Sequence, residues 1–145
     1  MKYALDWLSD PEVFAVNRIA AHSDHKYYRN YYEMEEKNSS FIQNLNGIWK
    51  FAWAKNPSER IEDFYKEDFN TDSFDNIRVP GHIELQGYGK PQYVNTMYPW
   101  EGRETLFPPY ISEKDNPIGS YVRYFDLEDG LKGKDIYISF QGAET

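Results

Sequence analysis

Leu45-Asn-Gly-Ile-Trp-Lys-Phe-Ala-Trp53 is the stretch of sequence that decides the fold. It opens with Asn46-Gly47, a dipeptide that strongly favours a tight turn. The residues that follow alternate between two faces, and Trp49 and Trp53 fall on the same one. This alternation predicts a β-strand over residues 48–54, with both tryptophans in the core.

Further strands are expected downstream of this one. Branched and aromatic residues predict a short strand at 77–79, and two more at 118–126 and 135–140. A loop rich in Gly, Pro and aromatic residues runs from about 81 to 116, and a loop of that length is usually functional or docked on a neighbour. The pattern indicates an all-β fold, with residues 41–145 forming the β-domain.

Residues 1–40 have a different character, because they mix Pro, Asn, His and charge with aromatic residues. The tract 27–37 has no sustained apolar face at helical spacing. We therefore expect residues 1–40 to form an extended, irregular amino-terminal arm that docks through scattered aromatic side chains. Asn56-Pro-Ser-Glu59 is typical of a cap, and it predicts a short helical or irregular segment ending near Lys66.

The charge and composition of the chain limit the classes of partner that it could bind. The 145 residues carry a net charge of −8, which disfavours binding to nucleic acid or to anionic membrane surfaces. No run of about 18 apolar residues occurs, and the amino terminus lacks the apolar stretch of a signal peptide. Cysteine is absent, which excludes disulfides and fits a cytoplasmic protein.

Few residues suggest catalysis or metal binding. The three histidines, His22, His25 and His82, lack metal-site spacing, and we read them as ordinary surface or packing residues. Four loop glutamates could be considered as a pair of catalytic carboxylates, which lie about 5 Å apart when one acts as nucleophile and the other as acid. Nothing in the sequence sets that separation, so we read them as solvated charges and assign no catalytic residue; they are Glu84, Glu101, Glu104 and Glu113. Five aromatic residues could offer ring faces for stacking: Trp49, Trp53, Tyr93, Tyr98 and Trp100. Of these, Trp100 and Tyr98 in the loop are the more open to a binding or domain-docking role.

Several motifs together resemble the amino-terminal sugar-binding domain of family 2 glycoside hydrolases, of the β-galactosidase type. The motifs, in chain order, are Asp10-Pro-Glu-Val13, Asn17-Arg18, Leu45 to Trp53, Val79-Pro-Gly-His-Ile-Glu-Leu-Gln-Gly-Tyr88, Pro91-Gln-Tyr-Val-Asn-Thr-Met-Tyr-Pro99 and Asn116-Pro-Ile-Gly-Ser-Tyr121. The resemblance implies a jelly-roll, galactose-binding-like β-sandwich. It also implies that the closing strands lie beyond Thr145, which would leave the sandwich incomplete at the carboxyl end.

The resemblance implies one substrate-binding residue, Asn95, whose family counterpart hydrogen-bonds the galactosyl group. A carboxamide offers both donors and acceptors to a sugar hydroxyl. The alternative is that Asn95 caps a turn, as Asn does in many loops. The catalytic glutamates of the family belong to a later domain, and its magnesium and sodium would find their main ligands outside this chain, so no cofactor is expected here.

Three functions remain open on the sequence. The resemblance implies part of a β-galactosidase that hydrolyses terminal β-D-galactosides with retention, supplying substrate contacts and assembly to the remaining domains of a homo-oligomeric enzyme. The alternatives are a stand-alone carbohydrate-binding module, and an interaction fragment that complements a truncated β-galactosidase. Whether the chain is an enzyme by itself stays open.

Overall fold

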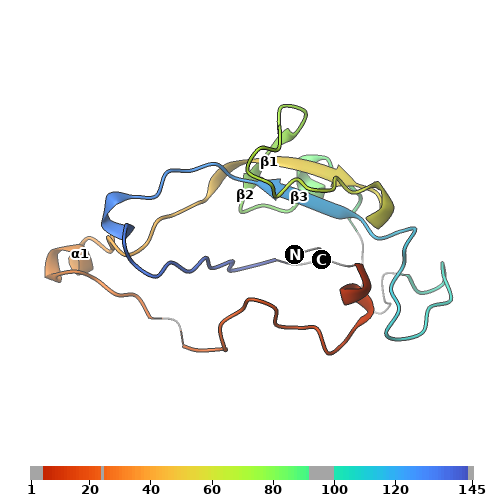
Figure 1. Cartoon of the computed structure of the whole chain (residues 1–145), viewed down its shortest axis with the longest axis horizontal. Helices are drawn as coiled ribbons and strands as arrows, with labels where there is room; N and C mark the ends of the chain where they lie inside the picture. Colours follow the sequence, from red (N-terminus) through yellow and green to blue (C-terminus); the bar gives the residue numbers. More distant parts are fainter. Residues whose placement is uncertain (1–4, 24, 92–99, 144–145) are drawn as a thin grey trace. The chain divides into compact units, whose positions relative to one another are not determined.

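A three-stranded antiparallel sheet is the centre of the fold. The computed structural model describes residues 5–23, 25–91 and 100–143. The strands are β1 (Gly47–Ala54), β2 (Asp75–Val79) and β3 (Ile118–Val122), in the order β2-β1-β3. Figure 1 shows the three arrows lying together. The expected all-β class is confirmed at this level.

The strand predictions hold best at the centre of the sheet. The strand expected at 48–54 is β1, and that expected at 77–79 is the second half of β2. The strand expected at 118–126 begins at Ile118 as predicted but ends at Val122. Its pairing with β1 runs from Ile118 opposite Ala54 to Val122 opposite Lys50, so β3 ends where the ladder ends.

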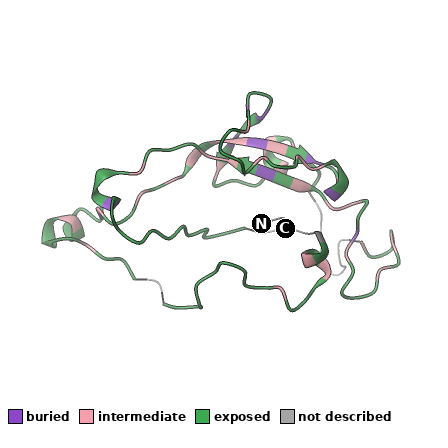
Figure 2. Ribbon diagram, viewed as in Figure 1, coloured by how far each residue is buried: buried purple, intermediate pink, exposed green. Residues whose placement is uncertain are grey.

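Phe51 is the centre of the core. Its side chain is fully buried, and Ile77 on β2 is 1% exposed. The Phe51 ring meets Tyr88 edge-on with ring centroids 4.6 Å apart, and Tyr121 at 4.7 Å. Such aromatic contacts add to the stabilisation from apolar burial. In Figure 2 the strands carry buried and half-buried positions, while the long connecting segments are mostly exposed.

The two strand tryptophans are less buried than predicted. Trp49 is half-buried, but Trp53 is 37% exposed, so the core assignment is wrong for Trp53. The register places Trp53 opposite Gly119 on β3. A glycine partner offers no side chain to cover the indole, which explains the exposure.

The strand expected at 135–140 is absent from the described structure. None of these residues is paired in the sheet, and Ile136, Tyr137, Ile138 and Phe140 are each more than half exposed. A strand needs a neighbouring backbone as well as suitable side chains. The sequence supplied the side chains here, but no described segment supplies the partner.

Short helices occupy the connections. They are η1 (Leu5–Ser9), α1 (Tyr31–Glu35), η2 (Pro57–Glu59), η3 (Glu84–Gln86) and η4 (Asp129–Leu131). η2 begins at the predicted cap, where the Asn56 side chain accepts from the backbone N–H groups of Ser58 and Glu59, although it ends well before Lys66.

The α1 helix corrects the reading of the tract 27–37 as non-helical. Its N-cap is Asn30, whose Oδ1 accepts from the Glu33 N–H at 2.9 Å. The Glu33 carboxylate in turn accepts from the backbone N–H groups of Arg29 and Ser40. One turn of helix is therefore held by its caps and not by an apolar stripe, which is why periodicity missed it.

The chain divides into two compact units. The first comprises Met1–Ala20 and Asn46–Tyr124 and contains the sheet; the second comprises Ala21–Leu45 and Phe125–Thr145. In the second unit, the Gln43 carboxamide joins two distant segments. Its Nε2 donates to the Asp126 carbonyl at 2.8 Å, and its Oε1 accepts from the Glu128 N–H at 3.1 Å.

Candidate functional site

The long loop between β2 and β3 is the candidate site. It was predicted over 81–116, and β2 and β3 end and begin at its two sides. Asn95, the predicted substrate ligand, lies outside the described residues, as do Tyr93 and Tyr98. The flanking segments 81–91 and 100–116 are described, and each is tied down by specific hydrogen bonds.

The first flank is tied to β2 at two places. The Gln86 carboxamide accepts from the Arg78 N–H at 2.8 Å and donates to the Arg78 carbonyl at 3.0 Å. The Tyr88 hydroxyl donates to the Asp75 carboxylate at 2.9 Å, while its ring rests against Phe51. Gln86 and Tyr88 therefore hold the chain that leaves β2 against that strand.

The second flank, residues 100–116, is held by hydrogen bonds between its own residues. The Trp100 indole N–H donates to the Asp115 carbonyl at 2.6 Å, and Arg103 forms a 2.9 Å ion pair with the Asp115 carboxylate. The fully buried Ser112 hydroxyl donates to the Glu104 carboxylate at 2.5 Å and accepts from the Asp115 N–H at 2.9 Å. These contacts join residues 100–104 to 112–115 just before the chain enters β3.

These bonds revise two expectations for the loop. Glu104 was expected to be a solvated charge, but it is half-buried and bound to Ser112, so that expectation is wrong. Glu101 and Glu113 are exposed, as expected, and Glu84 is half-buried. Trp100 is half-buried and builds the loop through its indole N–H, a role that its place in an irregular loop did not predict.

Two tyrosines near this loop have raised pKa values. Partial burial raises the pKa of the Tyr88 phenol, and the hydrogen bond to Asp75 raises it further. Burial also raises the pKa of Tyr121, with a smaller contribution from the negative charge of Glu84. Both phenols therefore stay neutral, and able to donate a hydrogen bond, beyond the ordinary range of tyrosine.

The histidines do not gather into a site in the described structure. His22, His25 and His82 are all exposed. Across residues 5–23, 25–91 and 100–143, no group of three or more His, Cys, Asp or Glu side chains could hold a metal ion.

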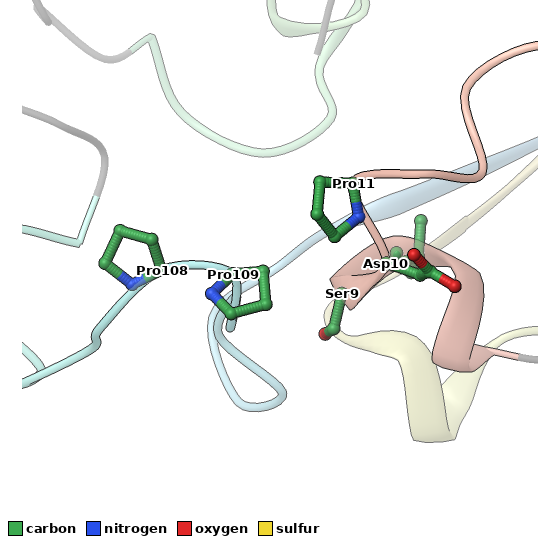
Figure 3. A pocket seen from close by; sticks show the side chains of 6 residues that line it. Ser9, Asp10, Pro11, Pro108 and Pro109 are labelled. Atoms are coloured by element: carbon green, nitrogen blue, oxygen red, sulfur yellow. The ribbon is translucent and has the colours of Figure 1, made fainter.

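A surface depression lies beside the amino-terminal 3-10 helix. It is lined by Leu8, Ser9, Asp10, Pro11, Pro108 and Pro109. Figure 3 shows Pro108 and Pro109 on one segment, facing Ser9, Asp10 and Pro11 on another. The Asp10 carboxylate already accepts from the Glu12 N–H at 3.0 Å. The lining is mostly apolar and includes no residue that the sequence predicted for a site.

The helices of the described structure include none long and apolar enough to cross a membrane.

Sequence reasoning missed three residues that hold the flanks of the loop: Gln86, Ser112 and Asp115. Gln86 lies in the quoted motif Val79 to Tyr88, but its partner is a backbone pair eight residues away, and no spacing rule signals such a bond.

Comparison with known proteins covers the sheet and both flanks of the loop. Residues 42–145 match the model of "Glycosyl hydrolases family 2, sugar binding domain". A β-galactosidase of Clostridium acetobutylicum is 54% identical over 145 residues, covering 99% of this chain and 16% of the relative. A β-galactosidase of Halalkalibacterium halodurans is 55% identical over 142 residues, covering 97% of this chain and 14% of the relative.

A third relative is the β-galactosidase large subunit of Leuconostoc lactis, which is 51% identical over 156 residues. The alignment covers 99% of this chain and 25% of that subunit. The chain thus spans a quarter or less of the length of these three relatives. Since the family model matches more than half of the chain, this protein belongs to glycosyl hydrolase family 2, as a sugar binding domain of that family.

Proposed function

We propose that this chain is the sugar-binding part of a β-galactosidase that hydrolyses terminal β-D-galactosides with retention. The observation that carries the proposal is the similarity to three β-galactosidases at 51–55% identity over nearly the whole chain. The chain supplies substrate contacts and assembly, and the catalytic carboxylates belong to the remaining domains of the enzyme.

Within this function, Asn95 is the proposed galactoside ligand. Support comes from the two flanks, since residues 81–88 are fastened to β2 and residues 100–115 are closed just before β3. Flanks held in this way suit a binding residue between them, because such a residue must meet its substrate in one place. The carboxamide chemistry of Asn95 suits a sugar hydroxyl.

The role of Asn95 is tested by Asn95→Ala in the assembled enzyme. We expect slower hydrolysis of a chromogenic β-galactoside with the fold intact, as judged by circular dichroism. Asn38→Ala is the matched control, because Asn38 is exposed and lies outside the loop. Equal kinetics for the two variants would remove Asn95 from the site.

The proposed fold of the full domain is a jelly-roll β-sandwich. The described sheet leaves large apolar side chains uncovered, including Trp53 and Tyr121, each 37% exposed. A second sheet packed on this face would bury them, as in other sandwiches. We further propose a homo-oligomeric enzyme of the cytoplasm, and the absence of cysteine is consistent with that compartment.

The function as a whole is tested by complementation. The chain alone should not hydrolyse a chromogenic β-galactoside. Mixed with the Clostridium acetobutylicum relative lacking the segment that this chain matches, it should restore hydrolysis. Activity of the chain alone would place a catalytic carboxylate pair within it, and an inactive mixture would count against the galactosidase assignment.

A second candidate is an interaction fragment whose role is assembly only. It is favoured by the exposed apolar side chains of the second unit, such as Tyr31, Tyr137 and Phe140, which are 66–79% exposed. Exposed apolar surface of this kind often marks a protein contact. Restored hydrolysis that is insensitive to Asn95→Ala would favour this candidate, and binding of galactosides by the chain alone would favour a carbohydrate-binding module.

A further inference from the structure

Residues 105–111 form an exposed tip on the loop that precedes β3. The tip reads Thr-Leu-Phe-Pro-Pro-Tyr-Ile and carries no charge, although 28% of the residues in the chain are charged. Phe107 is 71% exposed and Tyr110 is 67% exposed, and the two prolines between them are exposed as well. Two large rings and two prolines therefore face solvent within four consecutive residues.

The tip is held in one shape by its own contacts. The fully buried Ser112 hydroxyl donates to the Glu104 carboxylate at 2.5 Å, which joins the two ends of the tip. Within the tip, the Tyr110 N–H donates to the Phe107 carbonyl at 2.9 Å, and proline fixes φ at both positions in between. A segment held in this way loses little conformational entropy when it binds a partner.

The apolar surface continues from the tip to the amino-terminal 3-10 helix. Pro108 and Pro109 line the surface depression opposite Pro11 (Figure 3). Leu8 also lines it and is 51% exposed. Exposed apolar patches of this kind mark contacts with other proteins. We call this patch the loop-tip surface, and its residues are Leu8, Pro11, Phe107, Pro108, Pro109 and Tyr110.

Charge indicates which kind of partner fits the loop-tip surface. Three charged side chains that flank the tip are engaged within the loop, since Arg103 pairs with Asp115 at 2.9 Å and Glu104 accepts from Ser112. An uncharged tip suits an apolar partner surface, because a charged group buried against it would lose water without gaining a counter-charge. A second copy of this chain is a poor partner, since two molecules of net charge −8 repel each other.

We propose that the loop-tip surface docks on an apolar surface of the remaining domains of the β-galactosidase. The inference rests on the proposed function, in which this chain is one part of a larger enzyme. The three β-galactosidase relatives match 97–99% of this chain, yet the chain covers only 14–25% of their length. Such an enzyme contains ample further chain to cover an exposed apolar patch. Phe107 and Tyr110 should supply most of the binding energy, because buried aromatic side chains dominate many protein contacts.

The test titrates the Clostridium acetobutylicum relative, lacking the segment that this chain matches, with the 145-residue chain. Restored hydrolysis of a chromogenic β-galactoside reports the assembled enzyme. In the double variant Phe107→Ala, Tyr110→Ala, the chain concentration that gives half-maximal hydrolysis should rise by about tenfold or more. The KM at saturating chain should stay at the wild-type value, because docking acts on assembly and not on the sugar.

The double variant Thr105→Ala, Glu113→Ala is the matched control. Both residues are exposed and lie in the same loop on either side of the two rings, and neither carries a ring. This control should assemble at the wild-type concentration. Circular dichroism of each variant separates a loss of docking from a loss of fold.

Two further readouts do not depend on activity. Fluorescence anisotropy of the labelled chain measures its binding to the truncated relative directly, and the ring variant should bind about tenfold or more weakly there too. Hydrogen exchange over residues 105–111 of the wild-type chain should slow when the truncated relative is added, because docking protects the tip.

The outcomes separate this inference from the proposed function. Equal binding of the wild type and the ring variant in an active mixture would overturn the docking role alone. A raised KM with unchanged binding would overturn it as well, since the rings would then contact the sugar. So would a dimer of the chain, seen by sedimentation, that the ring variant dissociates. A wild-type mixture that neither binds nor hydrolyses would overturn the proposed function, and the inference with it.

Discussion

Two aromatic rings approach Gly119 so closely that a side chain at this position would clash with them. A Cβ at this position would be 2.7 Å from Cε2 of Phe51 and 3.1 Å from Cε2 of Tyr121. Gly119→Ala should therefore lower the free energy of unfolding by about 1–3 kcal/mol, the usual cost of overpacking. Urea unfolding followed by circular dichroism measures the change.

Gly142→Ala is the control for this prediction. No atom of the described residues lies within 4 Å of a Cβ built at Gly142, so the effect of Gly142→Ala should stay within about 0.5 kcal/mol. If both variants unfold at the same urea concentration as the wild type, the rings of Phe51 and Tyr121 do not rest on Gly119 in solution.

Alkaline pH should destabilise the chain through Tyr88 and Tyr121. Burial raises the pKa of both phenols, and Asp75 and Glu84 respectively add to the shift. An unfolded tyrosine ionises near about pH 10, while the folded phenols keep their protons to higher pH. The stabilisation is thus complete below about pH 10, and the free energy of unfolding falls as the pH rises from there towards the folded pKa values.

The measurement is urea unfolding at a series of pH values on either side of pH 10. The double variant Tyr88→Phe, Tyr121→Phe should show a shallower alkaline fall than the wild type. Tyr31→Phe serves as the control, since Tyr31 is 79% exposed. The same fall in all three proteins would assign the alkaline loss to other groups.

Single residues also show where sequence reasoning reached its limit. The alternation that marked Phe51 as a strand residue reflects a local backbone geometry, and it predicted the strand correctly. The bond from Ser112 to Glu104 depends on how an irregular loop folds back over eight residues. No period in the sequence records such a bond, so Glu104 was taken for a solvated charge.

At the scale of the element, the cap of α1 is open to test. Asn30→Ala removes the acceptor of the Glu33 N–H and should destabilise this turn by about 1 kcal/mol. Because the helix has only five residues, the loss should unfold the turn locally, seen as coil-like Cα chemical shifts over Tyr31–Glu35.

Asn38→Ala is again the control, because Asn38 is exposed beyond the end of α1. Helical chemical shifts that persist in Asn30→Ala would mean that the Glu33 contacts with Arg29 and Ser40 suffice to hold the turn.

The strands show that suitable local sequence is needed for a β-strand but does not by itself provide a pairing partner. β1 and β2 were predicted because turns and alternation mark them in the sequence, and each found a partner in the other. Residues 135–140 have equally suitable side chains, yet they are unpaired and exposed in the described structure. β-propensity describes fit to a pleated surface and does not provide one.

At the scale of the whole molecule, the chain should be marginally stable on its own. The buried apolar side chains of the described residues are few: Phe51, Ala54, Phe74, Ile77 and Leu131. We expect a broad thermal transition and a free energy of unfolding below the roughly 5–15 kcal/mol of typical domains. Adding the truncated β-galactosidase partner should raise the midpoint, because binding to the folded state stabilises it. A sharp, cooperative transition of the monomeric chain would contradict this expectation.

The sequence alone determined the all-β class and the position of β1, because turn residues and period-two alternation act over a few neighbouring positions. It also carried the motifs of the glycosyl hydrolase family to which residues 42–145 belong. Only the tertiary structure decided that Gln86 binds the edge of β2, that Trp53 is exposed opposite Gly119, and that residues 135–140 have no strand partner among the described residues. These features depend on which distant backbones meet, and local sequence does not specify that meeting.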